Sequence, residues 1–187
     1  MNIKGIFLRL WRLIIQPGAE WKEISSASPR EDVARMFVYP LTAVCGVAYL
    51  LGQVVRGEWG GGHFFSSAMS AVVHCVALLL TYFLVAWCVN QLRVRYLHQE
   101  EDMPLSFMLT GYSMALIFAL TIFVGLFPEM VLFKWILQFY VVYIVWNGAH
   151  TIMEVEEDKQ MTFTLVTSAL LLAVPAVVNL VFDKWVL

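Results

Sequence analysis

Charged residues are scarce in this sequence: Asp, Glu, Lys and Arg make up 14% of its 187 residues, whereas hydrophobic residues make up 60%. A soluble domain is usually about 45–50% apolar, so this composition excludes a water-soluble globule and predicts an integral membrane protein. The net charge of -2 excludes a strongly basic surface, and we therefore expect no nucleic-acid partner. The three cysteines, Cys45, Cys75 and Cys88, lie in apolar stretches without a CxxC pair, which predicts neither a disulfide framework nor a zinc site.

Catalytic motifs are also lacking. The sequence contains no GxSxG, no HExxH and no pair of aspartates placed within two hydrophobic stretches. Such motifs would supply the nucleophile or the metal-activated water that hydrolysis inside a membrane needs. We therefore predict a protein that is not an enzyme and that binds no cofactor.

Five apolar stretches are each long enough to cross a bilayer, which takes about 20 residues of helix. They are continuously apolar and do not alternate every second residue, which favours helices over barrel strands. The predicted spans are Met36–Val54, Phe64–Asn90, Leu105–Leu126, Val131–His150 and Thr162–Phe182. The sequence thus predicts an all-α integral membrane protein, with residues 1–35 as a cytoplasmic interfacial segment and residues 36–187 as a five-helix transmembrane bundle.

Basic residues are unevenly divided between the two sides of these spans. If the five spans alternate in direction, one side holds Lys4, Arg9, Arg12, Lys22, Arg30, Arg35, Arg93, Arg95 and Lys159, and the other holds Arg56, Lys134 and Lys184. Loops rich in Lys and Arg stay in the cytoplasm. The distribution therefore predicts a cytoplasmic N-terminus and a C-terminus outside.

The first 15 residues have the pattern of an amphipathic helix. Their hydrophobic residues, including Trp11, share one broad face, and Lys4, Arg9 and Arg12 lie opposite or beside it. A helix of this kind lies on the surface of an anionic membrane, so these four residues are predicted to contact lipid. The alternative is that the apolar face packs against the protein's own bundle.

Polar residues inside the spans are candidates for chemistry, because such residues normally face the bundle interior or a cavity. Tyr143, Asn147, His150 and Glu154 are spaced by four, three and four, which places them on one helix face. This stripe predicts either a polar pathway or a seam of hydrogen bonds between helices. His150 and Glu154 are weak candidates for metal ligands, since further ligands would have to come from the loop at residues 98–102.

Two further polar residues lie within predicted spans. His74 is expected to be neutral and hydrogen-bonded to a neighbouring helix, because a charged histidine in lipid is costly. Asn179 follows Pro175 by one turn and is expected to bond carbonyls that the proline frees.

Small residues spaced four apart, at Gly111, Ala115 and Ala119 and at Ala169 and Ala173, predict close helix packing. Such packing could occur within the bundle or in a homo-oligomer.

The segment Pro17-Gly18-Ala19-Glu20-Trp21-Lys22-Glu23-Ile24, followed by five spans and by Gly111-Tyr112-Ser113 in the third, resembles the Yip1 domain family, as a bacterial member. Eukaryotic members are five-span proteins of the early secretory pathway that bind Rab GTPases through a cytoplasmic N-terminal region. The resemblance implies that Pro17, Glu20 and Trp21 belong to a segment that docks on a protein partner. Trp21 could alternatively anchor the chain at the membrane interface.

Two functions follow from these observations. The first is a non-enzymatic scaffold or adaptor of the inner membrane that binds lipids and a protein partner through its N-terminal segment. The alternative is a small transporter or channel that uses the polar stripe of the fourth span. We also expect Lys22, Arg30 or Arg35 to pair with the acidic clusters at residues 100–102 and 154–158 and to hold the N-terminal segment against the bundle, unless both clusters are simply solvated.

Overall fold

The chain is all-helical and holds five segments long and apolar enough to span a membrane, as the sequence predicts. The computed structural model describes residues 3–26, 32–56 and 63–186, and over these residues it contains helices and no strand. The five segments are Ala34–Val55, Phe65–Leu97, Met103–Leu126, Pro128–Ile152 and Glu157–Phe182. Most of them reach further than predicted, because a helix can continue into its polar end while its backbone hydrogen bonds stay satisfied.

Nine α-helices account for most of the described residues. They are α1 (Ile3–Ile15), α2 (Pro17–Ser26), α3 (Tyr39–Val55), α4 (His63–Leu92), α5 (Met103–Ser113), α6 (Ala115–Leu126), α7 (Val131–Leu137), α8 (Val141–Ile152) and α9 (Glu157–Val186). The third span consists of α5 and α6, which are separated at Met114. The fourth consists of α7 and α8, joined by a 3-10 turn at Gln138–Tyr140. Two of the five spans are therefore broken near their middle.

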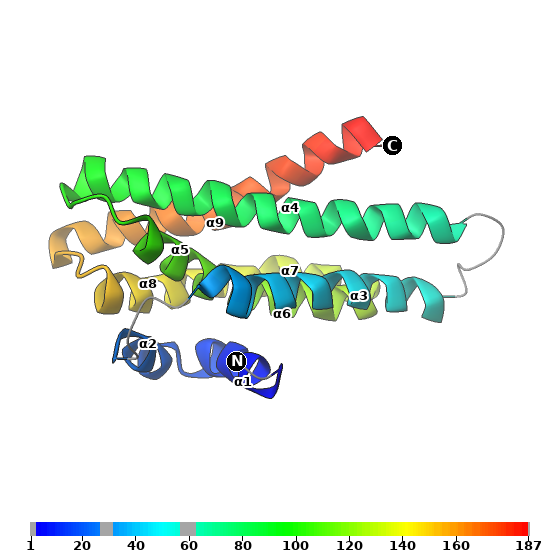
Figure 1. Ribbon diagram of the computed structural model, residues 1–187, viewed down its shortest axis with the longest axis horizontal. Helices are drawn as coiled ribbons and strands as arrows, with labels where there is room; N and C mark the ends of the chain where they lie inside the picture. The colour runs from blue at the N-terminus through cyan, green and yellow to red at the C-terminus, as the bar shows by residue number, and fades with distance from the viewer. Residues whose placement is uncertain (1–2, 27–31, 57–62, 187) are drawn as a thin grey trace.

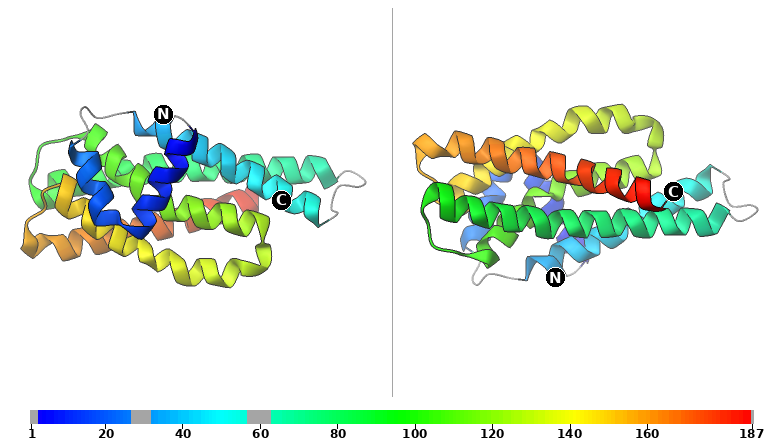
Figure 2. Two further views of the ribbon diagram at one scale, coloured as in Figure 1. Left: turned by 90° about the horizontal axis from the view of Figure 1, so that it is seen from below. Right: turned by 90° about the horizontal axis from the view of Figure 1, so that it is seen from above.

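The spans lie side by side along the long axis of the molecule, and α1 and α2 lie against one side of them (Figure 1). We call the end with the α4–α5 and α8–α9 connections the proximal end. The opposite end, with the turn at Pro128–Met130 between α6 and α7, is the distal end. Figure 2 shows α1 crossing the spans steeply, so that its axis lies close to the plane of a membrane that the spans would cross.

The third span forms the centre of the bundle. In its most apolar stretch 72% of the residues are buried, compared with 17% in the fourth span. Phe118 of α6 is fully buried. A close approach of α6 to α3 requires glycine, because a Cβ on Gly52 would lie only 2.0 Å from the backbone oxygen of Gly125. Small residues are thus used for packing inside the bundle, as in other membrane proteins.

Candidate functional site

The segment with the most specific contacts is the N-terminal hairpin, formed by α1 and α2. Pro17 occupies the first position of α2, where its missing N–H costs nothing. One face of α2 buries Pro17, Glu20, Trp21 and Ile24, at the three- and four-residue spacing of a helix. The motif that resembles the Yip1 family therefore faces the bundle.

Trp21 fixes α2 to the bundle. Its side chain is 0% exposed, and its Nε1 donates a hydrogen bond to the carbonyl oxygen of Ile144 at 3.0 Å. The indole meets the ring of Tyr112 edge-on at 5.9 Å between centroids. Gly148 makes room for it, since a Cβ there would lie 2.8 Å from Cζ2 of Trp21. Trp21 thus joins α2 to both α5 and α8.

A buried charge cluster joins α1 to α2. Glu20 is only 3% exposed, and its Oε1 lies 3.2 Å from Nε of Arg9. Nη1 of Arg9 also donates a hydrogen bond to the hydroxyl of Tyr112 at 3.0 Å. Burial raises the pKa of the Glu20 carboxyl, and nearby Glu23 acts in the same direction, whereas Arg9 and Arg12 oppose the rise. The hairpin thus brings opposite charges together in a partly dry site.

The broad apolar face predicted for α1 is divided in two. Ile6, Leu10 and Leu13 are buried against the bundle, which realises the alternative of self-packing. On the other side Ile3, Phe7, Leu8, Trp11 and Ile15 are exposed. A helical wheel cannot show this division, because it gives angles around one helix and not the position of its neighbour.

The predicted lipid-contacting residues of α1 separate in the same way. Lys4 and Trp11 are exposed and remain predicted membrane contacts, whereas the exposed Arg12 places its Nη1 3.3 Å from Oε2 of Glu23 on α2. Arg9 instead points to Glu20 and Tyr112, because a carboxylate and a phenol within reach satisfy the guanidinium.

The polar stripe of the fourth span lies on the outside of the bundle and does not face its interior. Tyr143, His150 and Glu154 are exposed, and the amide of Asn147 donates back to the carbonyl oxygen of Tyr143 at 2.7 Å. A Cβ on Gly18 of α2 would lie 3.0 Å from Oδ1 of Asn147, so the stripe borders the hairpin. This placement gives a pathway along the stripe no support, and the described residues contain no cluster of three metal-ligating side chains.

The other two polar residues, His74 and Asn179, line cavities. The ring of His74 stacks on Tyr49 of α3, with 6.3 Å between centroids, and lies at the edge of two cavities. Asn179 lines the larger of them together with Pro175. No hydrogen bond from either side chain is seen in the described part of the chain, so the two expected bonds stay predictions.

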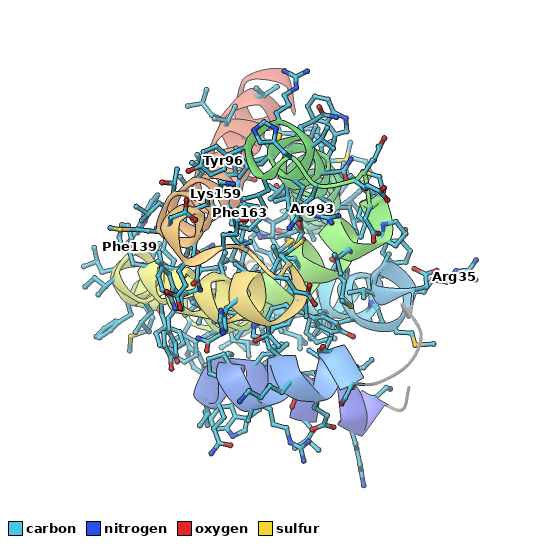
Figure 3. All side chains as sticks on the ribbon, turned by 90° about the vertical axis from the view of Figure 1, so that its left-hand side faces the viewer. Arg35, Arg93, Tyr96, Phe139, Lys159 and Phe163 are labelled. Atoms are coloured by element: carbon cyan, nitrogen blue, oxygen red, sulfur yellow. The ribbon has the colours of Figure 1, made fainter. Side chains whose placement is uncertain are left out.

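Sequence reasoning missed a buried polar network at the proximal end. Asn90 is fully buried; its amide donates to Glu101 at 3.0 Å, and its Oδ1 accepts from the backbone N–H of Asp102 at 3.1 Å. Arg93 donates to Gln99 and to the carbonyl oxygen of Asp102. Figure 3 shows Arg93 pointing inward between elements of the bundle. The short polar loop after a buried asparagine could have indicated this, since such a loop needs partners for its backbone.

The predicted ion pairs between the N-terminal segment and the acidic clusters do not form among the described residues. Arg35 points away from the bundle (Figure 3), and its Nε lies 3.6 Å from Oδ2 of Asp32. In the acidic clusters, Glu101 pairs with Asn90, and Glu156 lies 2.7 Å from Lys159. Arg30 lies outside the described residues. Local partners prevail because holding two distant exposed charges together costs side-chain entropy and gains little in water.

These features define a class: a multi-pass helical membrane protein with an N-terminal helical hairpin docked on its side. The family comparison is specific, because the model of the Yip1 domain matches residues 11–179 of the chain. The chain therefore belongs to the Yip1 domain family. Neither the curated proteins nor the solved structures gave a match. A bacterial source stays a prediction.

Proposed function

We propose that this Yip1-domain protein is a non-enzymatic membrane scaffold or adaptor whose docked N-terminal hairpin contacts the cytoplasmic leaflet and a protein partner. The observation that carries the proposal is the two-sided hairpin. One side is fixed to the bundle through Trp21, and the other presents exposed Ile3, Phe7, Leu8 and Trp11. An exposed apolar surface of this kind is typical of a site of interaction.

The proposed location is the inner membrane of a bacterial cell. In the proposed orientation the proximal end, together with α1 and α2, faces the cytoplasm. Its support is the concentration of Lys and Arg on that side of the spans. The steep crossing of α1 over the spans is the geometry that an in-plane amphipathic helix requires. Yip1-domain proteins are generally non-catalytic membrane trafficking proteins, which agrees with the absence of catalytic motifs in this sequence.

The roles of Pro17, Glu20 and Trp21 follow from their burial. A partner could touch them directly only if α2 left the bundle. In the docked state they hold the hairpin in position, and partner contact falls to exposed neighbours on α2 such as Lys22 and Glu23. A surface held rigid before binding loses less entropy when a partner binds, which favours affinity.

Site-specific photo-crosslinking in native membranes tests this proposal. A crosslinker at Leu8 is expected to label lipid, and one at Lys22 is expected to give a discrete protein adduct. Trp21→Ala should abolish that adduct by releasing the hairpin, whereas Trp11→Ala, in an exposed tryptophan, should preserve it. The adaptor proposal fails if Lys22 yields no discrete adduct, or if the adduct is indifferent to Trp21→Ala.

A further inference from the structure

A cleft in the distal half of the membrane region is separate from the hairpin. It has a volume of about 620 Å³ and lies between α4, α6, α7 and α9. Its polar lining comprises His74, Thr121, Lys134, Gln138 and Asn179. A second cavity of about 290 Å³ adjoins it and shares His74, Thr121 and Lys134. Both volumes are comparable to known ligand pockets or somewhat smaller.

Lys134 is the unusual residue of this cleft. It lies six residues after Pro128 at the start of the fourth span, which is about 9 Å along the helix. Its side chain is half-buried and pairs with no carboxylate in the described part of the chain. A lysine that only extended toward the membrane surface would not line both cavities beside His74. An ionisable residue inside a membrane span marks a functional site by default.

The charges and donors of the lining indicate the kind of ligand. Among the described residues neither cavity is lined by Asp or Glu, whereas Lys134 lines both. Thr121, Gln138 and Asn179 add neutral hydrogen-bond donors around the larger cleft. A lysine with several neutral donors, and no acid among the described lining residues, selects an anion with several acceptor oxygens, as a phosphate has.

The remaining lining is apolar, which distinguishes a lipid from a soluble anion. Leu172, Ala176 and Leu180 of α9 face Val131 and Trp135 of α7 across the cleft. These residues belong to spans, where hydrocarbon chains surround the protein. We propose that the cleft binds an anionic phospholipid of the distal leaflet, with the phosphate beside Lys134 and the first part of the acyl chains between α7 and α9.

Native mass spectrometry of the purified full-length protein in detergent tests the lipid assignment. The probes are phosphatidylglycerol, diacylglycerol, which lacks the phosphate, and glycerol phosphate, which lacks the chains. We expect phosphatidylglycerol to bind more tightly than diacylglycerol and to resist competition by glycerol phosphate. Equal binding of diacylglycerol would overturn anion recognition, and efficient competition by glycerol phosphate would overturn the assignment to a lipid.

Variants locate the binding to this cleft and not to another basic part of the protein. Lys134→Met should weaken the tightest phosphatidylglycerol binding about tenfold, and Lys134→Arg should preserve it, because only the charge is essential. Arg95→Met, at an exposed basic residue of the proximal end that lines neither cavity, is the matched control and should bind like the unmodified protein. If Lys134→Met does not fold, Ala176→Trp fills the cleft from its apolar side and should weaken the same binding. Wild-type binding by a folded Lys134→Met or Ala176→Trp protein would refute the site.

Discussion

Trp21 should decide whether the N-terminal hairpin stays on the bundle. A tryptophan buries about 150–250 Å², and at about 25 cal/mol per Å² this is worth about 4–6 kcal/mol against water. The released indole can enter lipid or the membrane interface instead of water, which reduces the free energy that docking gains from burying it. Truncation of a fully buried tryptophan to alanine usually costs about 3–5 kcal/mol, so we expect about 3 kcal/mol for Trp21→Ala.

The docking equilibrium can be measured as protection of a cysteine from a membrane-impermeant maleimide. The cysteine replaces Ile24, which is 6% exposed against the bundle, in a chain whose three native cysteines are replaced by alanine. Trp21→Ala should accelerate labelling about 100-fold, because about 1.4 kcal/mol corresponds to tenfold. Trp21→Phe keeps most of the apolar contact and loses the hydrogen bond to Ile144, so it should accelerate labelling about tenfold.

Trp11→Ala is the matched control for this experiment. Trp11 lies on the same hairpin but is 61% exposed, so its removal should leave the labelling rate nearly unchanged. Labelling that accelerates less than threefold in Trp21→Ala, or equally in Trp11→Ala, would refute the conclusion that burial of Trp21 holds the hairpin.

Two further predictions concern the hairpin, and a third concerns the buried polar network at the proximal end. Burial raises the pKa of Glu20 above its usual 4.5, so protonation favours docking. Protection of the cysteine at position 24, measured relative to a fully exposed reference cysteine at each pH, should increase as the pH falls from 7 through the raised pKa, because the thiolate is the reacting form in both. Glu20→Gln should remove this relative dependence. Gly148→Ala places a Cβ 2.8 Å from Cζ2 of Trp21 and should accelerate labelling about tenfold. Gly18→Ala, whose Cβ would meet the flexible side chain of Asn147, should accelerate labelling less. The reverse order would contradict the packing. Asn90→Ala removes the acceptor of the Asp102 N–H and should lower the free energy of unfolding by about 1–3 kcal/mol. The measurement is the thermal unfolding temperature in detergent, which should fall. Gln91→Ala, at the half-buried neighbouring residue, is the control and should change this temperature less.

The five spans follow from the sequence, because the requirement for them is local. A segment of about 20 apolar residues has to satisfy its own backbone hydrogen bonds in lipid, and only a helix does so. The amphipathic helix in the first 15 residues and the Yip1 motif are equally local patterns. Both could therefore be predicted from the sequence.

The position of polar residues was predictable only in part. Tyr143, Asn147 and His150 share one face of α8, as their spacing requires, but α8 ends at Ile152 and Glu154 lies beyond it with a φ of 48°. Periodicity states which residues lie together and not which way they face. The neighbouring helices decide that, and they leave this stripe on the outside, bordered by α2.

Tertiary structure alone brought together residues that are far apart in the chain. Arg9 meets Tyr112 across 103 positions, Trp21 meets Ile144 across 123, and Lys134 shares a cleft with His74. The sequence by itself determines that the chain is helical and enters a membrane, because hydrophobicity acts on each segment separately. It does not determine which faces meet, because helix packing in lipid depends on close shape complementarity and on pairing of buried polar groups, and both arise only when all the segments are in place.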